Sequence, residues 1–166
     1  MTEPVIRRAR PEDDAALAEL FRTAWSGTSE ITPRPAPGEP FFHDGSRPEH
    51  YLVASLDERL VAYLRLVQPI PVDSVAHVRQ IQGLAVDASV RRRGIASTLV
   101  RAAMAESRRA GATRLTLRVL ATNDPAIALY EKLEFHLEGR LRDEFKLDGR
   151  YVDDLLMARR LNGDAG

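Results

Sequence analysis

The chain has 166 residues, 44% of them hydrophobic, which is the size of one domain with a core of its own. It contains no cysteine, and this excludes disulfide bonds, thiolate metal sites and a cysteine nucleophile. Its 24 basic and 24 acidic residues give a net charge of zero, which argues against a chain whose whole surface binds polyanions such as nucleic acid.

The charges are nevertheless separated along the chain. Residues 11–58 hold ten acids against three arginines, whereas residues 89–118 hold eight arginines against Glu106 alone. We therefore expect one local site for an anion rather than a uniformly charged surface. The chain opens without an apolar leader, and no stretch approaches 18 uncharged apolar residues, so we expect a cytoplasmic protein without membrane contact.

The first half of the chain is expected to hold four strands, one helix and one long loop. A short strand is predicted over Val5–Arg8, and Pro11 then opens a helix whose apolar residues recur at helical spacing: Leu17, Leu20, Phe21 and Ala24. Residues 27–48 carry five of the ten prolines and no periodicity, which predicts a functional or mobile loop. The strands that follow are predicted over Tyr51–Leu56, Leu60–Val67 and Val75–Val86.

The second half is expected to alternate helices and strands. A helix from Ile95 to Ala110 should end at Gly111 in the C′ position, and a strand follows over Thr113–Val119. Asp124 before Pro125 fits an N-cap at the start of a second helix. The last strands are predicted over Phe135–Leu141 and Tyr151–Ala158, around a turn at Asp148-Gly149. This order predicts a mixed α/β single domain over residues 1–166.

The stretch that carries most chemistry joins a strand to a helix. It reads Gly83-Leu84-Ala85-Val86 and, after a short linker, Arg91-Arg92-Arg93-Gly94-Ile95-Ala96. Gly83 inside the strand indicates a bulge or the close approach of a ligand. A helix N-terminus exposes unpaired N–H groups, so a small-residue entry flanked by arginines favours a phosphate. Taken alone, the same pattern also fits a solvated loop or a nucleic-acid patch.

A second stretch, about thirty residues further on, makes the pattern specific. It runs from Asn123 through Ala128-Leu129-Tyr130 to Phe135. Together the two stretches resemble the GNAT N-acyltransferase superfamily: Arg91-x-x-Gly94-x-Ala96 is similar to its coenzyme A pyrophosphate loop, and Asn123 with Ala128-Leu129-Tyr130 to its second motif. The tail, from Glu138-Gly139 to Met157-Ala158-Arg159, looks like that of bacterial small-molecule acetyltransferases, L-amino-acid N-acetyltransferases among them.

The resemblance implies a fold and a coenzyme. The fold is the GNAT acyl-CoA N-acyltransferase fold, an α/β (α+β) arrangement in which a mixed, mostly antiparallel sheet has a central splayed parallel strand pair and flanking helices. The co-substrate is acetyl-CoA, with its pyrophosphate on the N–H groups of Arg92 to Ser97 and its pantetheine amides on Leu84 and Val86. The implied coenzyme-binding residues are Leu84, Ala85, Val86, Arg91, Arg92, Arg93, Gly94, Ile95, Ala96, Ser97, Asn123, Ala126 and Tyr130.

The resemblance also implies a catalytic acid. Tyr130 would protonate the leaving thiolate, although without the motif it reads as a helix aromatic packed into the core. No carboxylate lies in the stretch from His77 to Gln82, where many family members place a glutamate, so we expect a water chain to a remote acid. Gln82 as a water ligand and His77 as a base stay open. Glu134 stands where the family usually has glycine, and it strains the backbone there if φ is positive.

The acceptor side is less determined. Four aromatic residues either line an acceptor pocket or cap the core: Trp25, Phe41, Phe42 and Tyr51. Asp153 and Asp154 either approach a substrate amine or pair with Arg140 or Arg142. Four early acids are expected to be a solvated helix face: Glu12, Asp13, Asp14 and Glu19. The histidines show no ligand spacing, so we expect no metal.

We therefore expect an N-acetyltransferase that moves the acetyl group of acetyl-CoA directly to a primary amine of a small molecule, with amino acids first. The alternatives are acetylation of a protein N-terminus, a lysine or an amine antibiotic, and a non-catalytic acyl-CoA-binding module. The expected partners are acetyl-CoA and the amine, with no nucleic acid and no membrane. A homodimer stays an open alternative.

Overall fold

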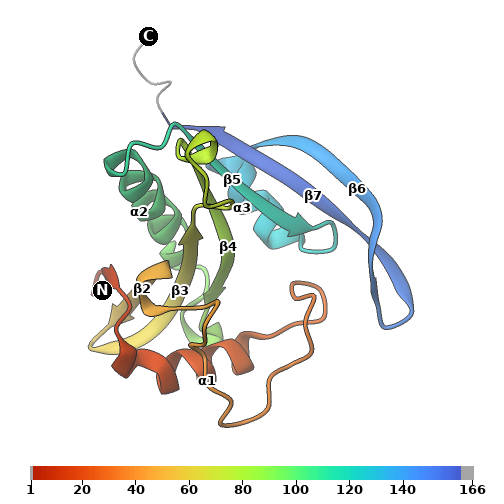
Figure 1. The fold of residues 1–166 in the computed structure, drawn as a ribbon. Helices are drawn as coiled ribbons and strands as arrows, with labels where there is room; N and C mark the ends of the chain where they lie inside the picture. The colour runs from red at the N-terminus through yellow and green to blue at the C-terminus, as the bar shows by residue number, and fades with distance from the viewer. Residues whose placement is uncertain (1, 162–166) are drawn as a thin grey trace. The chain divides into compact units, whose positions relative to one another are not determined.

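The computed structural model describes residues 2–161. The strands are β1 (Val5–Arg8), β2 (Tyr51–Leu56), β3 (Arg59–Val67), β4 (Val78–Val86), β5 (Arg114–Leu120), β6 (His136–Leu147) and β7 (Arg150–Arg160). The α-helices are α1 (Asp14–Ala24), α2 (Ile95–Arg109) and α3 (Asp124–Lys132), and the 3₁₀ turns are η1 (Pro11–Asp13), η2 (Pro48–His50), η3 (Asp73–Val75) and η4 (Ala88–Val90). The seven strands form one sheet in the order β1-β2-β3-β4-β5-β7-β6 (Figure 1).

The sheet is mixed, as the resemblance implied. β4 and β5 run parallel, with a register from Val78 opposite Arg114 to Ile81 opposite Leu117. β1 with β2, β2 with β3, β5 with β7 and β6 with β7 are antiparallel. Both strands of the parallel pair continue beyond this register, β4 to Val86 and β5 to Leu120. The splay predicted for the pair stays a prediction.

The described residues group into two compact units, each drawn from several segments. The first contains the residues up to Trp25, Arg34–Val67 and Gln82–Ala103, and the second contains Ser26–Pro33, Gln68–Ile81 and the residues from Met104 onward. The single domain predicted over residues 1–166 stays a prediction. None of the helices within residues 2–161 has the length and apolarity that crossing a membrane requires.

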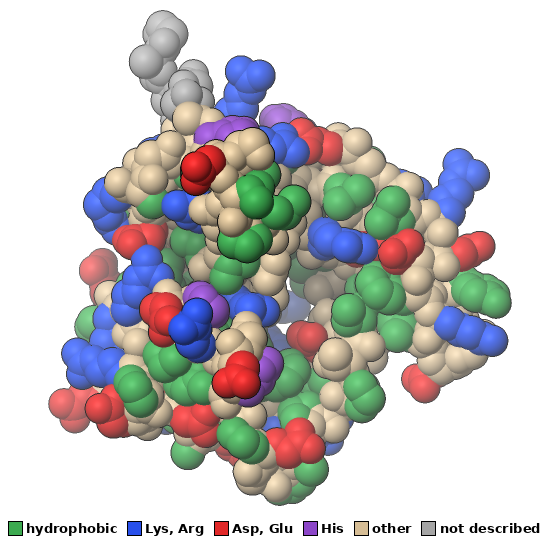
Figure 2. Space-filling model, viewed as in Figure 1, with side chains coloured by type: hydrophobic (Ala, Val, Ile, Leu, Met, Phe, Trp, Pro, Cys, Tyr) green, Lys and Arg blue, Asp and Glu red, His purple; other side chains and the backbone are tan. Residues whose placement is uncertain are grey.

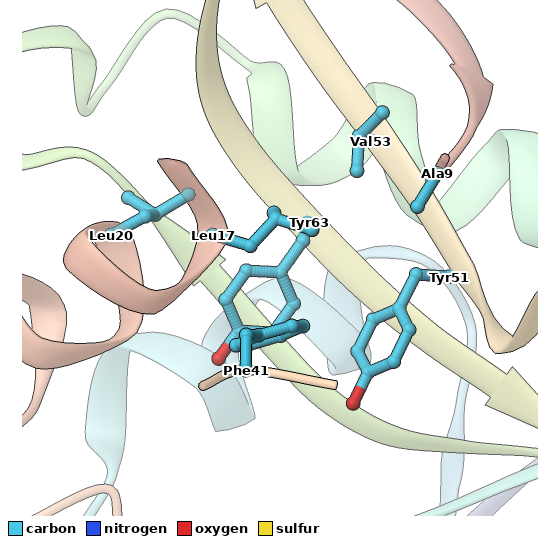
Figure 3. Packing of buried hydrophobic residues seen from close by; sticks show 7 residues of the cluster. All are labelled: Ala9, Leu17, Leu20, Phe41, Tyr51, Val53 and Tyr63. Carbon is cyan, nitrogen blue, oxygen red and sulfur yellow. The ribbon is translucent and has the colours of Figure 1, made fainter. Parts of the chain in front are cut away.

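An aromatic core holds the first unit together (Figure 3). The ring centroid of Phe41 lies 4.9 Å from that of Tyr51 and 5.1 Å from that of Tyr63, and Leu17 of α1 belongs to the same cluster. Each such ring pair contributes about 0.5–1.5 kcal/mol beyond its buried area. Phe41 and Tyr51 therefore belong to the core, as one of the two alternatives predicted, and Phe42 packs against them. For Trp25 both readings stay open.

Two of the acids expected on a solvated helix face are structural instead. Asp13 is buried, accepts hydrogen bonds from Nη1 of Arg7 at 2.7 Å and from the backbone N–H of Arg10 at 2.8 Å, and its pKa is lowered mainly by the Arg7 hydrogen bond. Oδ1 of Asp14 accepts from the N–H groups of Phe41 and Phe42 at 3.1 and 2.8 Å. These bonds fasten the loop after α1 to the helix start. The prediction was wrong here because composition does not show where a returning loop needs acceptors.

The predicted element order is confirmed, with three local corrections. The strand predicted from Val75 begins at Val78, because Asp73–Val75 forms η3. The cap of α3 is Asn123, one residue before the predicted Asp124, and its Oδ1 accepts from the N–H of Ala126 at 3.4 Å. β6 and β7 extend beyond their predicted ends toward the turn at Asp148-Gly149, where both residues have positive φ. On the face shown in Figure 2, basic and acidic side chains are intermixed.

Candidate active site

The start of α2 presents a run of backbone donors. Thr98 makes the first intrahelical bond of the helix, from its N–H to the carbonyl of Gly94 at 3.0 Å. Among residues 2–161, no acceptor takes a hydrogen bond from the N–H groups of Arg92 to Ser97. Left-handed φ values at Arg92 (65°) and Gly94 (75°) turn the chain sharply into the helix. Consecutive free N–H groups at a helix start favour an anion such as a pyrophosphate.

The side chains around this loop leave the site positively charged. Arg91, Arg92 and Arg93 are exposed and form no ion pair within the described part of the chain, although Nε of Arg91 donates to the carbonyl of Val86 at 3.3 Å. Other arginines of the basic segment are neutralised, as in the pairs Arg109–Glu106 and Arg114–Glu138. A Cβ placed on Gly94 would meet no heavy atom within 4 Å, so a bulky anion has room there. The loop therefore fits the phosphates of coenzyme A.

Asp87 anchors the segment that leads into this loop. Its N–H donates to the carbonyl of Val61 at 2.8 Å, and its Oδ1 accepts from the N–H of Ser89 at 2.8 Å. Arg59 of β3 pairs with its other oxygen at 3.1 Å. The hydrogen bond from the Ser89 hydroxyl is the largest cause of the lowered pKa of Asp87. These contacts tie η4 to β3 and fix where the loop begins.

The end of β4 carries the predicted pantetheine partners. Leu84, Ala85 and Val86 are half-buried, and Ala85 packs against the aromatic core. Gly83 has φ 159°, a backbone angle that residues with a side chain rarely adopt, so the backbone favours glycine here. The space does not require one, because a Cβ placed there would lie at an ordinary 3.8 Å from Cβ of Arg65 and Cε2 of Tyr63. The bulge predicted at Gly83 stays a prediction.

Tyr130 lies on α3, in the second unit, and is buried at 5% exposure. Its ring packs edge-on against Phe135, with the centroids 5.6 Å apart. Within residues 2–161 the hydroxyl has no hydrogen-bond partner, and the only fully buried side-chain polar atom without one is Nε of Arg65. The hydroxyl oxygen of Tyr130 is therefore not fully buried. Burial raises the pKa of Tyr130, so the phenol keeps its proton throughout the neutral range.

The C-terminus of α3 fixes the backbone of Tyr130. The N–H of Phe135 donates to the carbonyl of Tyr130 at 3.0 Å, and the N–H of Glu134 donates to the carbonyl of Glu131 at 3.0 Å. This is the Schellman pattern, whose C′ residue needs a left-handed conformation. Glu134 has φ 65°, so the strain expected where the family has glycine is confirmed.

Arg159 of β7 stabilises that strained end. Its Nη1 donates to the carbonyl of Leu133 at 2.7 Å and lies 3.2 Å from Oε2 of Glu134. The side chain of Arg159 is only 15% exposed, and its guanidinium lies at the C-terminus of α3, where a positive charge is favourable. Nothing in the sequence connected Arg159 with Tyr130, because the link runs through backbone atoms.

The structure places the remaining candidates as follows. Asp153 pairs with Arg140 at 2.6 Å, and the buried Asp154 pairs with Arg118 at 2.5 Å rather than with Arg142, so the ion-pair reading is the observed one. Asn123, besides capping α3, is half-buried. Within residues 2–161, no group of three or more histidine, aspartate or glutamate side chains could hold a metal ion, and the absence of a metal stays a prediction.

Sequence reasoning missed one carboxylate. Glu30 is half-buried, and no described side chain forms a hydrogen bond or ion pair with its carboxylate. Desolvation raises its pKa. Its segment is docked to the residue before Asn123, because Oγ1 of Thr122 donates to the carbonyl of Thr28 at 3.0 Å. A single glutamate in a proline-rich loop carries no sequence signal of its own.

Comparison with known proteins agrees with this geometry. The model of the "Acetyltransferase (GNAT) family" matches residues 15–135. The L-amino acid N-acetyltransferase AaaT of Escherichia coli K12 is 32% identical over 166 residues, covering 96% of this chain and 99% of that protein.

Solved structures share the fold. The protein smu.2055 of Streptococcus mutans UA159 superposes with a TM-score of 0.83 at 29% identity, covering 95% of this chain and 99% of that one. A GNAT superfamily phosphinothricin acetyltransferase of Sinorhizobium meliloti, solved with acetyl-CoA, gives 0.78 at 21% identity, covering 100% and 92%. The family match spans both helices that carry the predicted site, and the chain is a member of the acetyltransferase (GNAT) family.

Proposed function

We propose that this acetyltransferase binds acetyl-CoA and transfers its acetyl group directly to the primary amine of a small molecule, with amino acids as the first class to test. The observation that carries the proposal is the run of N–H groups from Arg92 to Ser97, which, like the three arginines beside them, have no partner among the described residues apart from the contact of Arg91 with the Val86 carbonyl. These donors suit the pyrophosphate of coenzyme A. The relative from Escherichia coli, an L-amino acid N-acetyltransferase, supports the choice of acceptor.

The reaction needs one proton acceptor and one proton donor. The neutral amine attacks the acetyl carbonyl carbon, the carbon–sulfur bond breaks, and the thiolate takes a proton. Tyr130 is the donor that we propose. Burial raises its pKa and makes the transfer harder, but the same desolvation also raises the pKa of a leaving thiol in that environment. The proton lost by the amine must go to a base.

For the base we propose Glu30, as the remote acid expected from the sequence. An unpaired carboxylate with a raised pKa suits proton transfer from an ammonium group. It accepts a proton only when ionised, so kcat/KM should fall as the pH drops through its raised pKa. In Glu30→Gln we expect kcat/KM to fall by about 10²–10⁴ and the acidic limb of the pH profile to disappear. The control is Glu39→Gln, at an exposed position of the same loop. An unchanged profile in Glu30→Gln excludes the role.

Steady-state release of free thiol from acetyl-CoA, with a panel of amino acids, a peptide N-terminus, lysine peptides and amine antibiotics, tests the reaction. Turnover with an amino acid as the best acceptor supports the proposal. No turnover with any amine, together with tight acetyl-CoA binding, would leave the binding-module alternative. Calorimetry on Gly94→Glu tests the coenzyme loop, because a side chain at φ 75° strains the loop and places a negative charge among the N–H donors. We expect a loss of affinity of at least about 100-fold with folding retained.

For location and assembly, only the sequence supports a proposal. We propose that the enzyme acts in the cytoplasm, without binding membranes or nucleic acid and without a metal. Light scattering decides between monomer and homodimer. Affinity for duplex DNA that falls steeply with salt would contradict the assignment of Arg91 to Arg93 to coenzyme binding.

A further inference from the structure

Arg65 of β3 lies against the strand proposed to hold the pantetheine arm. Its Cβ would be 3.8 Å from a Cβ placed on Gly83, the residue before Leu84. Its Nη2 donates to the carbonyl of Gly45 at 2.5 Å, so the guanidinium is also held by the loop that precedes β2. Arg65 therefore contacts both β4 and the loop of residues 27–48, which the sequence predicts to be functional or mobile. All of these residues belong to the first unit.

The guanidinium of Arg65 is poorly satisfied. It forms no ion pair with any described carboxylate, and its contact with Gly45 uses one nitrogen. Its Nε is the only fully buried side-chain polar atom within residues 2–161 that has no hydrogen-bond partner. Buried polar atoms are nearly always paired, and exceptions point to a ligand or a functional role. A partly buried arginine without a carboxylate is suited to receive one from a ligand.

The charged groups that act on His50, which Arg65 also reaches, are mostly positive. His50 lies close enough for Arg65 to affect it: its pKa is lowered by burial first and by the charge of Arg65 second. Arg47 and Arg8 lower it further, and Glu49 alone raises it. Glu49 is exposed and pairs with Arg47 at 3.4 Å. Three arginines, Arg65 among them, therefore act on His50 against the single carboxylate of Glu49.

We propose that Arg65 binds the carboxylate of the acceptor, and that the acceptor is an amino acid with a free α-carboxylate. This inference rests on the proposed function and adds the residue that selects the substrate class. In an α-amino acid the amine nitrogen and the carboxylate carbon are both bonded to the α-carbon, so the two groups lie close together. A carboxylate bound at Arg65 therefore brings the amine toward Gly83 and Leu84, the part of β4 where the pantetheine arm is proposed to bind.

The test compares an L-amino acid with its carboxamide, which keeps the amine and loses the negative charge. The amino acid is the best acceptor of the panel, and kcat/KM is measured for both in the wild type, Arg65→Met and Arg65→Lys. We expect the wild type to prefer the amino acid by roughly 10- to 100-fold, the range for a hydrogen bond to a charged group. Arg65→Met should lose that preference while its activity on the carboxamide stays within about twofold of the wild type. Arg65→Lys should keep part of it, because an ammonium group binds a carboxylate without the paired geometry.

Controls separate selection from damage to the fold. Arg22→Met removes an arginine of α1 that pairs with Glu19 on the surface, and it should leave both rates unchanged. Acetyl-CoA affinity of Arg65→Met should match the wild type within error, and the stability lost with the hydrogen bond to the Gly45 carbonyl should affect both acceptors equally. An equal loss on both acceptors, or a wild type that does not distinguish them, overturns the inference while acetyl transfer stands. Absence of turnover with every amine overturns the proposed function itself.

Discussion

The C-terminal ends of α2 and α3 both belong to the second unit and share one hydrogen-bond pattern, but with different residues. At the end of α2, Gly111 (φ 83°) donates to the carbonyl of Arg108 and Ala112 donates to that of Ser107, both at 2.9 Å. At the end of α3, Glu134 (φ 65°) takes the place of the glycine. A left-handed conformation costs a non-glycine residue about 1–2 kcal/mol. The cost at α3 is accompanied by a contact from Arg159 to Glu134.

The difference lies in what each helix end holds in place. At the end of α2, the residue that follows the left-handed Gly111 is Ala112, which has no ring to pack on the helix. At α3 that residue is Phe135, whose ring packs on Tyr130. Arg159 also donates to the carbonyl of Leu133, so a strand, a helix end and an aromatic pair are connected. The glycine only ends a helix, whereas at α3 the contact of Arg159 with Leu133 also holds the helix end that carries the proposed catalytic side chain.

The largest expected effect comes from removing the hydroxyl of Tyr130, the proposed proton donor on α3. Tyr130→Phe keeps the ring contact with Phe135 and deletes only the hydroxyl. We expect kcat to fall by about 10²–10⁴ because the leaving thiolate loses its proton donor. Acetyl-CoA affinity and the unfolding temperature should not change. Tyr151→Phe, at a tyrosine that is 64% exposed, is the control. Unchanged turnover in Tyr130→Phe would leave this tyrosine as a packing residue alone.

Arg159→Met removes the polar contacts that distinguish the end of α3 from the end of α2. Losing the hydrogen bond to Leu133 should lower the free energy of unfolding by about 1.5–3 kcal/mol, and kcat should fall with KM for acetyl-CoA nearly unchanged. The matched control is Arg108→Met, because Nε of Arg108 donates to the carbonyl of Leu161 at the same 2.7 Å. We expect Arg108→Met to cost stability but not kcat. Equal losses of kcat in the two variants would show that Arg159 acts on stability only. Denaturant unfolding and steady-state kinetics measure both quantities.

Gly111→Glu places a glutamate in the left-handed position at the end of α2, where it has no counterpart of the contact between Arg159 and Glu134. A Cβ at Gly111 would meet no heavy atom within 4 Å, so only backbone strain opposes the substitution. We expect a loss of about 1–2 kcal/mol in unfolding free energy and no change in kcat. Chemical denaturation at neutral pH gives the first value. A loss below about 0.5 kcal/mol would mean that the left-handed position tolerates glutamate without help, and Arg159 would then not be needed at α3.

The sequence predicted the parts of the fold that depend on local pattern. β1 and β2 have their predicted bounds, and Gly111 closes α2, because alternation and a C′ glycine are short-range signals. It also identified Glu134 as a strained position, because the family usually has glycine there. Arg159, Arg65 and the pairing of Asp154 with Arg118 were not predictable, because each depends on which strands become neighbours. The N-cap of α3 was misplaced by one residue, since Asn123 and Asp124 are both good caps and only the observed bond to Ala126 distinguishes them.

Glu134→Gly has the smallest expected effect and is the most sensitive test of the comparison. Glycine relieves the left-handed strain, which favours folding by about 1 kcal/mol, but it loosens the unfolded chain and removes the ion pair with Arg159. Glu134 is 72% exposed on its side chain, and a pair of this kind contributes about 0–1 kcal/mol. We therefore expect a net change in unfolding free energy within about 1 kcal/mol, on the stabilising side, with kcat within twofold of the wild type. Arg159 retains its hydrogen bond to Leu133 in this variant, so Tyr130 should stay in place. A fall in kcat without a loss of stability would instead assign the positioning role to the glutamate, and the contact with Leu133 would be insufficient for it.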